Sequence, residues 1–190
     1  GSMGYAMTDA KYADHVVVVT DCLVDFPNMP ASVEAIDVDA VVVVDSIGNP
    51  KKIASAAARI SQNPRDLMMA ENVAKVIAST PYFKDGFSFQ TGAGGATLAT
   101  AKYVQDIMLA KGIKGSYGMG GITKYMVEML NNGCFQALLD VQCFELKAVE
   151  SIRKNPKHQE ISSIHYASPS ARSAVVDSLD VVLHLHCLKH

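Results

Sequence analysis

The stretch "GFSFQTGAGGATLA", Gly86 to Ala99, decides the fold because it joins a strand, a glycine turn and the start of a helix. Apolar and polar residues alternate over Gly86–Thr91, which predicts a strand. Glycines then allow a sharp turn, and a helix is predicted over Ala96–Lys111. A helix that begins directly after a strand presents unpaired backbone N–H groups, which favour an anion or a developing oxyanion.

The same order of strand and helix continues along the chain. Further strands are predicted at Ser116–Met119, Gln136–Gln142, Glu160–Tyr166 and Leu179–His184, and further helices at Thr123–Asn132 and Phe144–Asn155. Upstream, a helix is predicted to begin at Pro64 with Asn63 as its N-cap. This alternation predicts an α/β fold with a mainly parallel sheet and helices on both faces.

Two valine-rich runs precede that region. "HVVVVTD" (His15–Asp21) and "DAVVVVD" (Asp39–Asp45) have the composition of strands buried on both faces of a parallel sheet. We therefore expect both to lie inside the sheet.

A second glycine motif, "GMGGIT" at Gly118–Thr123, repeats the spelling of "GAGGAT" at Gly92–Thr97. Both are predicted to be turns between a strand and a helix. If the two strands are neighbours, the turns converge at the carboxyl edge of the sheet, where ligands of α/β proteins bind. The pair predicts a ligand with more than one negative group.

Other interpretations of these glycines are weaker. Gly92-x-Gly94 resembles the start of a dinucleotide fingerprint, but Thr97 takes the third glycine position and no acidic residue ends the next strand. Neither turn is followed by the lysine of a phosphate-binding P-loop. Close packing of strand and helix also explains a single turn.

Composition narrows the function classes. The 190 residues are 49% hydrophobic with a net charge of −2 and no basic stripe, so no nucleic-acid partner is expected. The apolar runs are too short to span a membrane. Four cysteines without C-x-x-C spacing indicate reduced, buried thiols in a cytoplasmic protein. The tail "HLHCLKH" contains histidines and a cysteine, but no second ligand cluster lies upstream, so no metal site is expected.

Longer stretches of the chain resemble the α subunit of citrate lyase, a citrate CoA-transferase. The resemblance is carried by "GYAMTDAKYADHVVVVTDCLVDFPNMPAS", "STPYFKDGFSFQTGAGGATLA", "GMGGIT", "LLDVQCFELKAVESIRKNP" and "HQEISSIHYASP". It implies a CoA-transferase-like fold in which two related α/β halves enclose the active site. It also implies that acetate is exchanged for citrate on a thioester of an acyl carrier protein or coenzyme A. No other bound cofactor is implied.

Family chains are much longer than this one, which therefore resembles an internal piece holding much of the second half. We expect one partial domain over residues 4–182, an expression-tag remnant at 1–3 and a divergent tail at 183–190. The resemblance implies an oligomer that works with a β subunit, which cleaves the citryl thioester, and with an acyl-carrier γ subunit.

Site residues follow from the glycine motifs together with this resemblance. The turn on the thioester side is expected to comprise Gln90, Thr91, Gly92, Ala93, Gly94 and Gly95. The second part of the ligand is expected at Gly118, Gly120, Gly121 and Thr123, and Gln142 and Tyr166 are expected to line the cleft. Backbone N–H donors there stabilise the oxyanions of acyl transfer. Glu145 and Glu150 are predicted to lie on a solvated helix face.

The chain departs from the family at its end. Related CoA-transferases use a glutamate from a segment after the strand corresponding to "LDVV", but this chain continues with "LHLHCLKH". No catalytic nucleophile is therefore assigned, and the piece is expected to be inactive alone. Two alternatives stay open: a non-catalytic module with the CoA-transferase fold, and a Rossmann-like nucleotide-binding protein.

Overall fold

The computed structural model describes residues 2–49, 58–170, 172 and 174–184, and these contain two parallel sheets. The larger sheet has five strands in the order β6-β5-β4-β3-β7. Their bounds are Phe89–Thr91 (β3), Gly115–Ile122 (β4), Phe135–Cys143 (β5), His158–Glu160 (β6) and Val181–Leu183 (β7). All neighbouring strands run parallel, as the alternation of strands and helices predicts.

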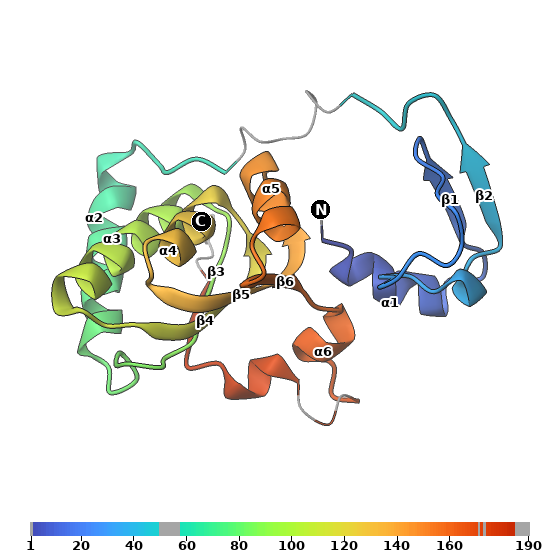
Figure 1. Cartoon of the computed structure of the whole chain (residues 1–190). Helices are drawn as coiled ribbons and strands as arrows, with labels where there is room; N and C mark the ends of the chain where they lie inside the picture. Colours follow the sequence, from blue (N-terminus) through green and yellow to red (C-terminus); the bar gives the residue numbers. More distant parts are fainter. Residues whose placement is uncertain (1, 50–57, 171, 173, 185–190) are drawn as a thin grey trace.

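Helices cover both faces of this sheet (Figure 1). One face carries α3 (Gly95–Lys111), α4 (Lys124–Asn131) and α5 (Leu146–Lys154), the three connections between successive strands. Helix α2 (Pro64–Ser79) packs against α3. The opposite face carries α6 (Ser163–Ala167) and the 3₁₀ helix η3 (Val175–Ser178). The predicted α/β fold, with a mainly parallel sheet and helices on both faces, is confirmed.

The core lies between the sheet and the layer of α3 and α4. Phe87 sits at its centre, with ring centroids 5.1 Å from Phe83 and 5.7 Å from Phe135. Offset aromatic contacts of this kind add to the stabilisation that burial provides. No helix among the described residues has the length and apolar character required to cross a membrane.

Local capping explains where the confirmed helices begin and end. The Asn63 side chain accepts a hydrogen bond from the Arg65 N–H at 3.0 Å and Pro64 takes the first helical position, as predicted for α2. Helix α3 ends at Gly112, whose φ of +69° is a left-handed conformation that glycine adopts without strain.

Two parts of the chain differ from the sequence-based expectation. The predicted strand Glu160–Tyr166 is wrong: β6 ends at Glu160, and Ser162 caps α6 by accepting the His165 N–H at 3.3 Å. A helix α1 at Gly4–Tyr12 was not predicted, and its weak amphipathic pattern explains why. Its position is fixed by tertiary packing, because a Cβ on Gly4 would lie 2.4 Å from the Ile161 carbonyl oxygen.

The valine-rich runs form a separate two-stranded parallel sheet, β1 (Val17–Thr20) and β2 (Ala40–Val43), beside α1 and the short 3₁₀ helix η1 (Ala35–Asp37) (Figure 1). The expectation that they are buried on both faces is wrong for this chain. Val41, Val42 and Val43 are 51%, 45% and 58% exposed. Within the described ranges the two strands pair only with each other and do not join the five-stranded sheet.

Candidate functional site

The carboxyl ends of β3 and β4 lie side by side at one edge of the large sheet. The two strands pair directly, with Phe89 opposite Gly118. Helix α3 begins just after β3, and α4 begins just after β4. The predicted convergence of two helix N-termini at one sheet edge is therefore confirmed.

The α3 N-terminus is a bare backbone turn. Gly94 occupies the N-cap position without a side-chain hydrogen bond, and the Thr97 hydroxyl donates to the Gly94 carbonyl at 2.6 Å. A Cβ on Gly95 would lie 3.0 Å from the Arg59 carbonyl oxygen, so the close approach of these two chain segments favours glycine. In the part of the chain that the structure describes, the N–H groups of residues 95–97 donate to no protein acceptor.

The α4 N-terminus differs because the chain fills it with its own carboxylate. Glu145 accepts a hydrogen bond from the Lys124 N–H at 3.1 Å and is only 4% exposed. An anion at this position compensates the helix dipole. The prediction that Glu145 lies on a solvated face is wrong, whereas Glu150 is exposed and pairs with Lys154 at 2.7 Å.

The predicted turn at Gly118–Thr123 is also wrong, since β4 continues to Ile122. The pairing of β4 with β5 shifts between Gly120 and Gly121, which marks an irregularity of the β-bulge kind. Gly120 has a φ of +114°, which an L side chain rarely adopts. Because of the bulge, β4 continues through Gly120 and Gly121, where the sequence predicted a turn.

Two of the predicted glycines serve packing. A Cβ on Gly118 would lie 2.4 Å from the Met126 Cε in the core, and one on Gly121 would lie 2.0 Å from the Phe144 ring. Thr123 is buried at the α4 N-cap, and its hydroxyl has no hydrogen-bond partner within the described ranges.

Three predicted residues from distant parts of the chain meet at the bulge, and we call them the Gln90–Gly120–Tyr166 cluster. A Cβ placed on Gly120 would lie 3.4 Å from the Gln90 Cγ and 3.8 Å from the Tyr166 hydroxyl. Burial, with a smaller effect of nearby Tyr5, raises the pKa of Tyr166. The phenol therefore stays protonated at neutral pH and able to donate a hydrogen bond.

The remaining predicted residues lie around this edge. Thr91 is buried and pairs with Leu183 of β7, while Gly92 and Ala93 are half-buried between β3 and α3. Gln142 is exposed and stands opposite Gly121 in the β4–β5 register.

A buried polar network that the sequence did not reveal lies under α5. Asp140 and His158 are fully buried, with 3.0 Å between Oδ2 and Nε2, and the His158 Nδ1 lies 2.9 Å from the Ser151 hydroxyl. The Cys143 thiol donates to the same Asp140 oxygen at 2.9 Å. Burial and this hydrogen bond raise the pKa of Cys143 to about 12. No sequence signal linked these four residues, because their spacing matches no motif.

The cysteines and histidines form no metal centre among the residues that the structure describes: no group of three or more potential ligand side chains gathers there. Cys134 is buried as predicted and Cys22 is exposed, contrary to the prediction, and both are free thiols. The tail residues His186, Cys187 and His190 lie outside the described residues.

Comparison with known proteins gives a consistent result. The family model "Citrate lyase, alpha subunit" matches residues 1–189. The citrate lyase α chains of Klebsiella pneumoniae and Haemophilus influenzae are 46% and 45% identical over 183 residues. Each match covers 96% of this chain but only 36% and 37% of the relative, so the chain spans little more than a third of their length.

Solved structures agree with the sequence matches. A Streptococcus mutans protein described as a citrate lyase α subunit in complex with citrate superposes with a TM-score of 0.87 at 50% identity, covering 96% of this chain and 36% of that one. A malonate decarboxylase α subunit from Acinetobacter baumannii shares the fold, with a TM-score of 0.55 at 19% identity over 87% of this chain and 33% of its own. The family match over nearly every residue and the shared architecture lead to one conclusion: the chain belongs to the citrate lyase α subunit family.

Proposed function

We propose that this chain is part of a citrate CoA-transferase and that its sheet edge binds citrate and an acyl thioester. The parent protein would exchange acetate for citrate on a thioester of coenzyme A or of an acyl-carrier phosphopantetheine arm. The products would be citryl thioester and acetate, and β and γ subunits of a citrate lyase complex would be the partners.

One observation carries the proposal. The N–H groups of the first turn of α3 and the Gln90–Gly120–Tyr166 cluster lie at the same edge of the sheet, where the neighbouring strands β3 and β4 end. The superposable Streptococcus mutans protein is described as a complex with citrate. An edge rich in donors suits a tricarboxylate and the oxyanion that forms during acyl transfer.

The proposed site uses two kinds of hydrogen-bond donor. The N–H groups at Gly95–Thr97 would stabilise an oxyanion, because they are fixed by the helix and need no reorganisation. The Gln90 amide and the Tyr166 phenol would hold a carboxylate of citrate. The α4 N-terminus would contribute little, since Glu145 already neutralises it. The sequence predicted two equivalent glycine turns as the ligand site. We propose instead that the ligand binds at the glycine turn before α3 and at the Gln90–Gly120–Tyr166 cluster.

The test is a chimera, because about two thirds of a family chain lies outside these residues. The matched segment of the Klebsiella pneumoniae chain is replaced by this chain, and acetyl-CoA with labelled citrate is followed by mass spectrometry for citryl-CoA. We expect the chimera to form citryl-CoA and the 190-residue chain alone to form none. A folded chimera that forms no citryl-CoA would contradict the proposal and would favour a non-catalytic module.

A matched pair of variants then tests the cluster. Tyr166→Phe removes only the hydroxyl, and a lost hydrogen bond to a charged group costs about 1.5–3 kcal/mol, so kcat/KM for citrate should fall by roughly 10- to 100-fold. Tyr82→Phe is the control, because Tyr82 is exposed in the turn that follows α2, away from the cluster. Equal activity of the two variants would show that the Tyr166 hydroxyl does not contact citrate.

A further inference from the structure

Helix α1 begins beside the Gln90–Gly120–Tyr166 cluster. Gly4, its first residue, is buried, and a Cβ there would lie 2.4 Å from the Ile161 carbonyl oxygen and 2.7 Å from the Val141 Cα. Val141 is the residue of β5 that the register shift after Gly120 leaves without a partner in β4. The start of α1 therefore packs directly on the bulge that carries Gly120.

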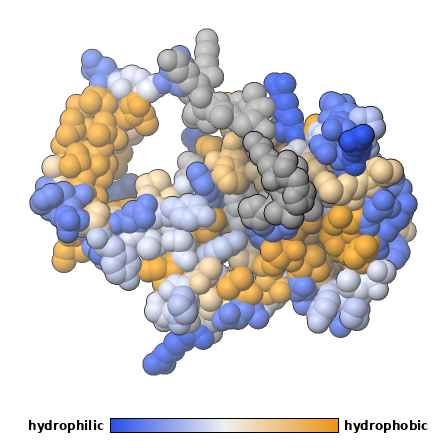
Figure 2. Space-filling model, turned by 180° about the vertical axis from the view of Figure 1, so that it is seen from behind, coloured by the Kyte–Doolittle hydropathy of each residue, from blue (hydrophilic) through white to orange (hydrophobic). Residues whose placement is uncertain are grey.

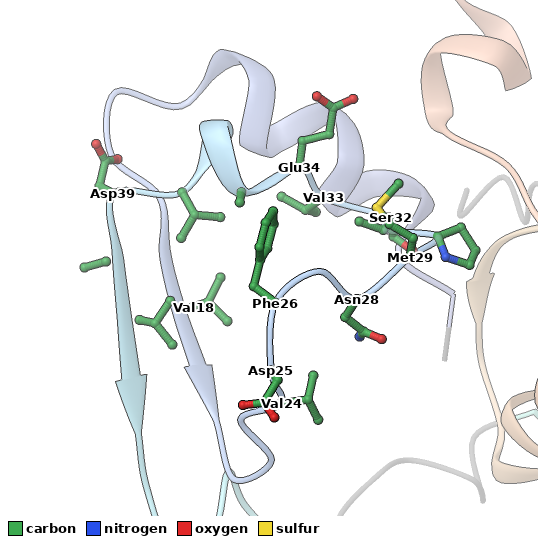
Figure 3. A pocket seen from close by; sticks show the side chains of 16 residues that line it. Val18, Val24, Asp25, Phe26, Asn28, Met29, Ser32, Val33, Glu34 and Asp39 are labelled. Carbon is green, nitrogen blue, oxygen red and sulfur yellow. The ribbon is translucent and has the colours of Figure 1, made fainter.

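Hydrogen bonds hold α1 in this place. The Glu160 carboxylate accepts from the Met3 N–H at 2.9 Å and from the hydroxyl of Ser32, which lines a cavity of about 850 Å³ beside β1 and β2 (Figure 3). The Ser163 hydroxyl donates to the Thr8 hydroxyl at 2.6 Å and joins α1 to α6. Strands β1 and β2, whose exposed valines form hydrophobic surface in Figure 2, lie on the side of α1 away from the large sheet (Figure 1). Of these three elements, α1 is therefore the one that reaches the cluster.

This packing brings Tyr5, the residue after Gly4, close to Tyr166. The Tyr166 hydroxyl lies 3.8 Å from a Cβ placed on Gly120, and Gly4 packs on Val141 at the same bulge. Burial raises the pKa of Tyr166, and the neighbouring Tyr5 phenol raises it further, because two phenolates so close would repel each other. Tyr5 is 50% exposed, and neither hydroxyl donates to a protein acceptor within the described ranges. Two phenol groups therefore stand together at the bulge.

We propose that the Tyr5 hydroxyl binds citrate together with Tyr166, at a carboxylate of citrate that does not react. This inference rests on the citrate-binding function proposed above. A carboxylate has acceptor sites for several donors, so two adjacent phenols can hold one group. Citrate keeps carboxylates that do not form the thioester, whereas the single carboxylate of acetate is the reacting one, so donors placed there discriminate between the two acids. Tyr5 is therefore a specificity-determining residue for citrate over acetate.

Kinetics of the Klebsiella pneumoniae chimera with the two acids test the inference. Tyr5→Phe removes only the hydroxyl, and loss of a hydrogen bond to a carboxylate should raise KM for citrate at least about tenfold. KM for acetate, measured with citryl-CoA in the reverse exchange, should stay unchanged. Tyr12→Phe is the control, since Tyr12 is 76% exposed at the other end of the same helix, and it should change neither value. An equal effect of Tyr5→Phe on the two acids would overturn the inference.

Calorimetry of citrate binding to the chimera gives a second measurement that does not depend on turnover. Tyr5→Phe should weaken binding further in a Tyr166→Phe background, because each hydroxyl contacts the ligand itself. No further loss would overturn the inference, since Tyr5 would then act only through Tyr166. An active chimera whose citrate affinity is unchanged by Tyr5→Phe would also overturn it and would leave the proposed function standing. A folded chimera without substitutions that binds no citrate would overturn both.

Discussion

The Glu145 carboxylate and the Lys124 backbone N–H lie 3.1 Å apart, so the strand-to-helix connection after β5 caps the helix that follows β4. This contact makes the two helix N-termini at the sheet edge unequal. Among the described residues the first N–H groups of α3 have no acceptor, whereas the α4 terminus is capped by the buried Glu145 carboxylate. The paired glycine motifs predicted that an anion binds at two helix termini, but only the α3 terminus is open to it.

Removal of this cap should destabilise the fold. Glu145→Ala leaves the Lys124 N–H without its acceptor, and loss of a helix cap costs about 0.5–2 kcal/mol. Urea denaturation followed by circular dichroism measures the change in the free energy of unfolding. Glu150→Ala is the control, because its exposed pair with Lys154 should contribute much less. Equal losses from the two variants would show that Glu145 is not a cap.

Substitution of Gly120 distinguishes the effect of backbone strain from the effect of crowding at the proposed ligand site. Gly120→Ala forces a side chain into a left-handed conformation, which costs about 1–2 kcal/mol, and places a methyl group 3.4 Å from the Gln90 side chain. Gly133→Ala has the same kind of backbone, with φ of +76°, but meets nothing within 4 Å. We expect similar losses of thermal stability from both variants, and loss of citrate binding in the chimera only for Gly120→Ala. Citrate binding that survives Gly120→Ala would place the ligand elsewhere.

The buried Asp140–His158 pair should be among the largest side-chain contributions to stability. Asp140→Ala leaves the buried His158 imidazole and the Cys143 thiol without their hydrogen-bond partner, and each buried polar group left unsatisfied costs about 1–3 kcal/mol. Asp106→Ala, which breaks an exposed pair with Lys102, is the matched control and should cost less than about 1 kcal/mol. Guanidinium denaturation of both variants measures the difference, and comparable midpoints would contradict the assigned role.

Cys143 should react slowly with alkylating reagents below pH 10. Its pKa of about 12 lies above its ordinary value of 9.0, because burial and the Asp140 hydrogen bond disfavour the thiolate. The alkylation rate, followed by peptide mass spectrometry, should rise about tenfold per pH unit up to about pH 12 in the folded chain. The same shift makes this thiol's contribution to stability complete below pH 9 and lost between about pH 9 and 12, since the unfolded chain loses the proton first. Asp140→Asn should accelerate the reaction, and an unchanged rate would count against the assigned cause.

Local sequence patterns determined most of the secondary structure. Asn63 and Pro64 set the start of α2, and glycines set both ends of α3, because caps and turns depend on residues adjacent in the chain. Alternation of strands and helices was enough to predict a parallel sheet. The order of residues in the longer motifs was enough to predict the family. All of these signals lie within short windows of sequence.

Tertiary structure decided the rest, since it depends on which surfaces meet. The same valine-rich pattern that predicts burial leaves β1 and β2 exposed here, because burial depends on a partner layer that a strand's own sequence does not encode. Gly118 and Gly121 resemble ligand-binding glycines, yet they are glycines because the Met126 and Phe144 side chains leave no room for a Cβ. Only the fold brings Gln90, Gly120 and Tyr166 together, because strand pairing and the return of the chain across the sheet set those distances, and no local pattern records them.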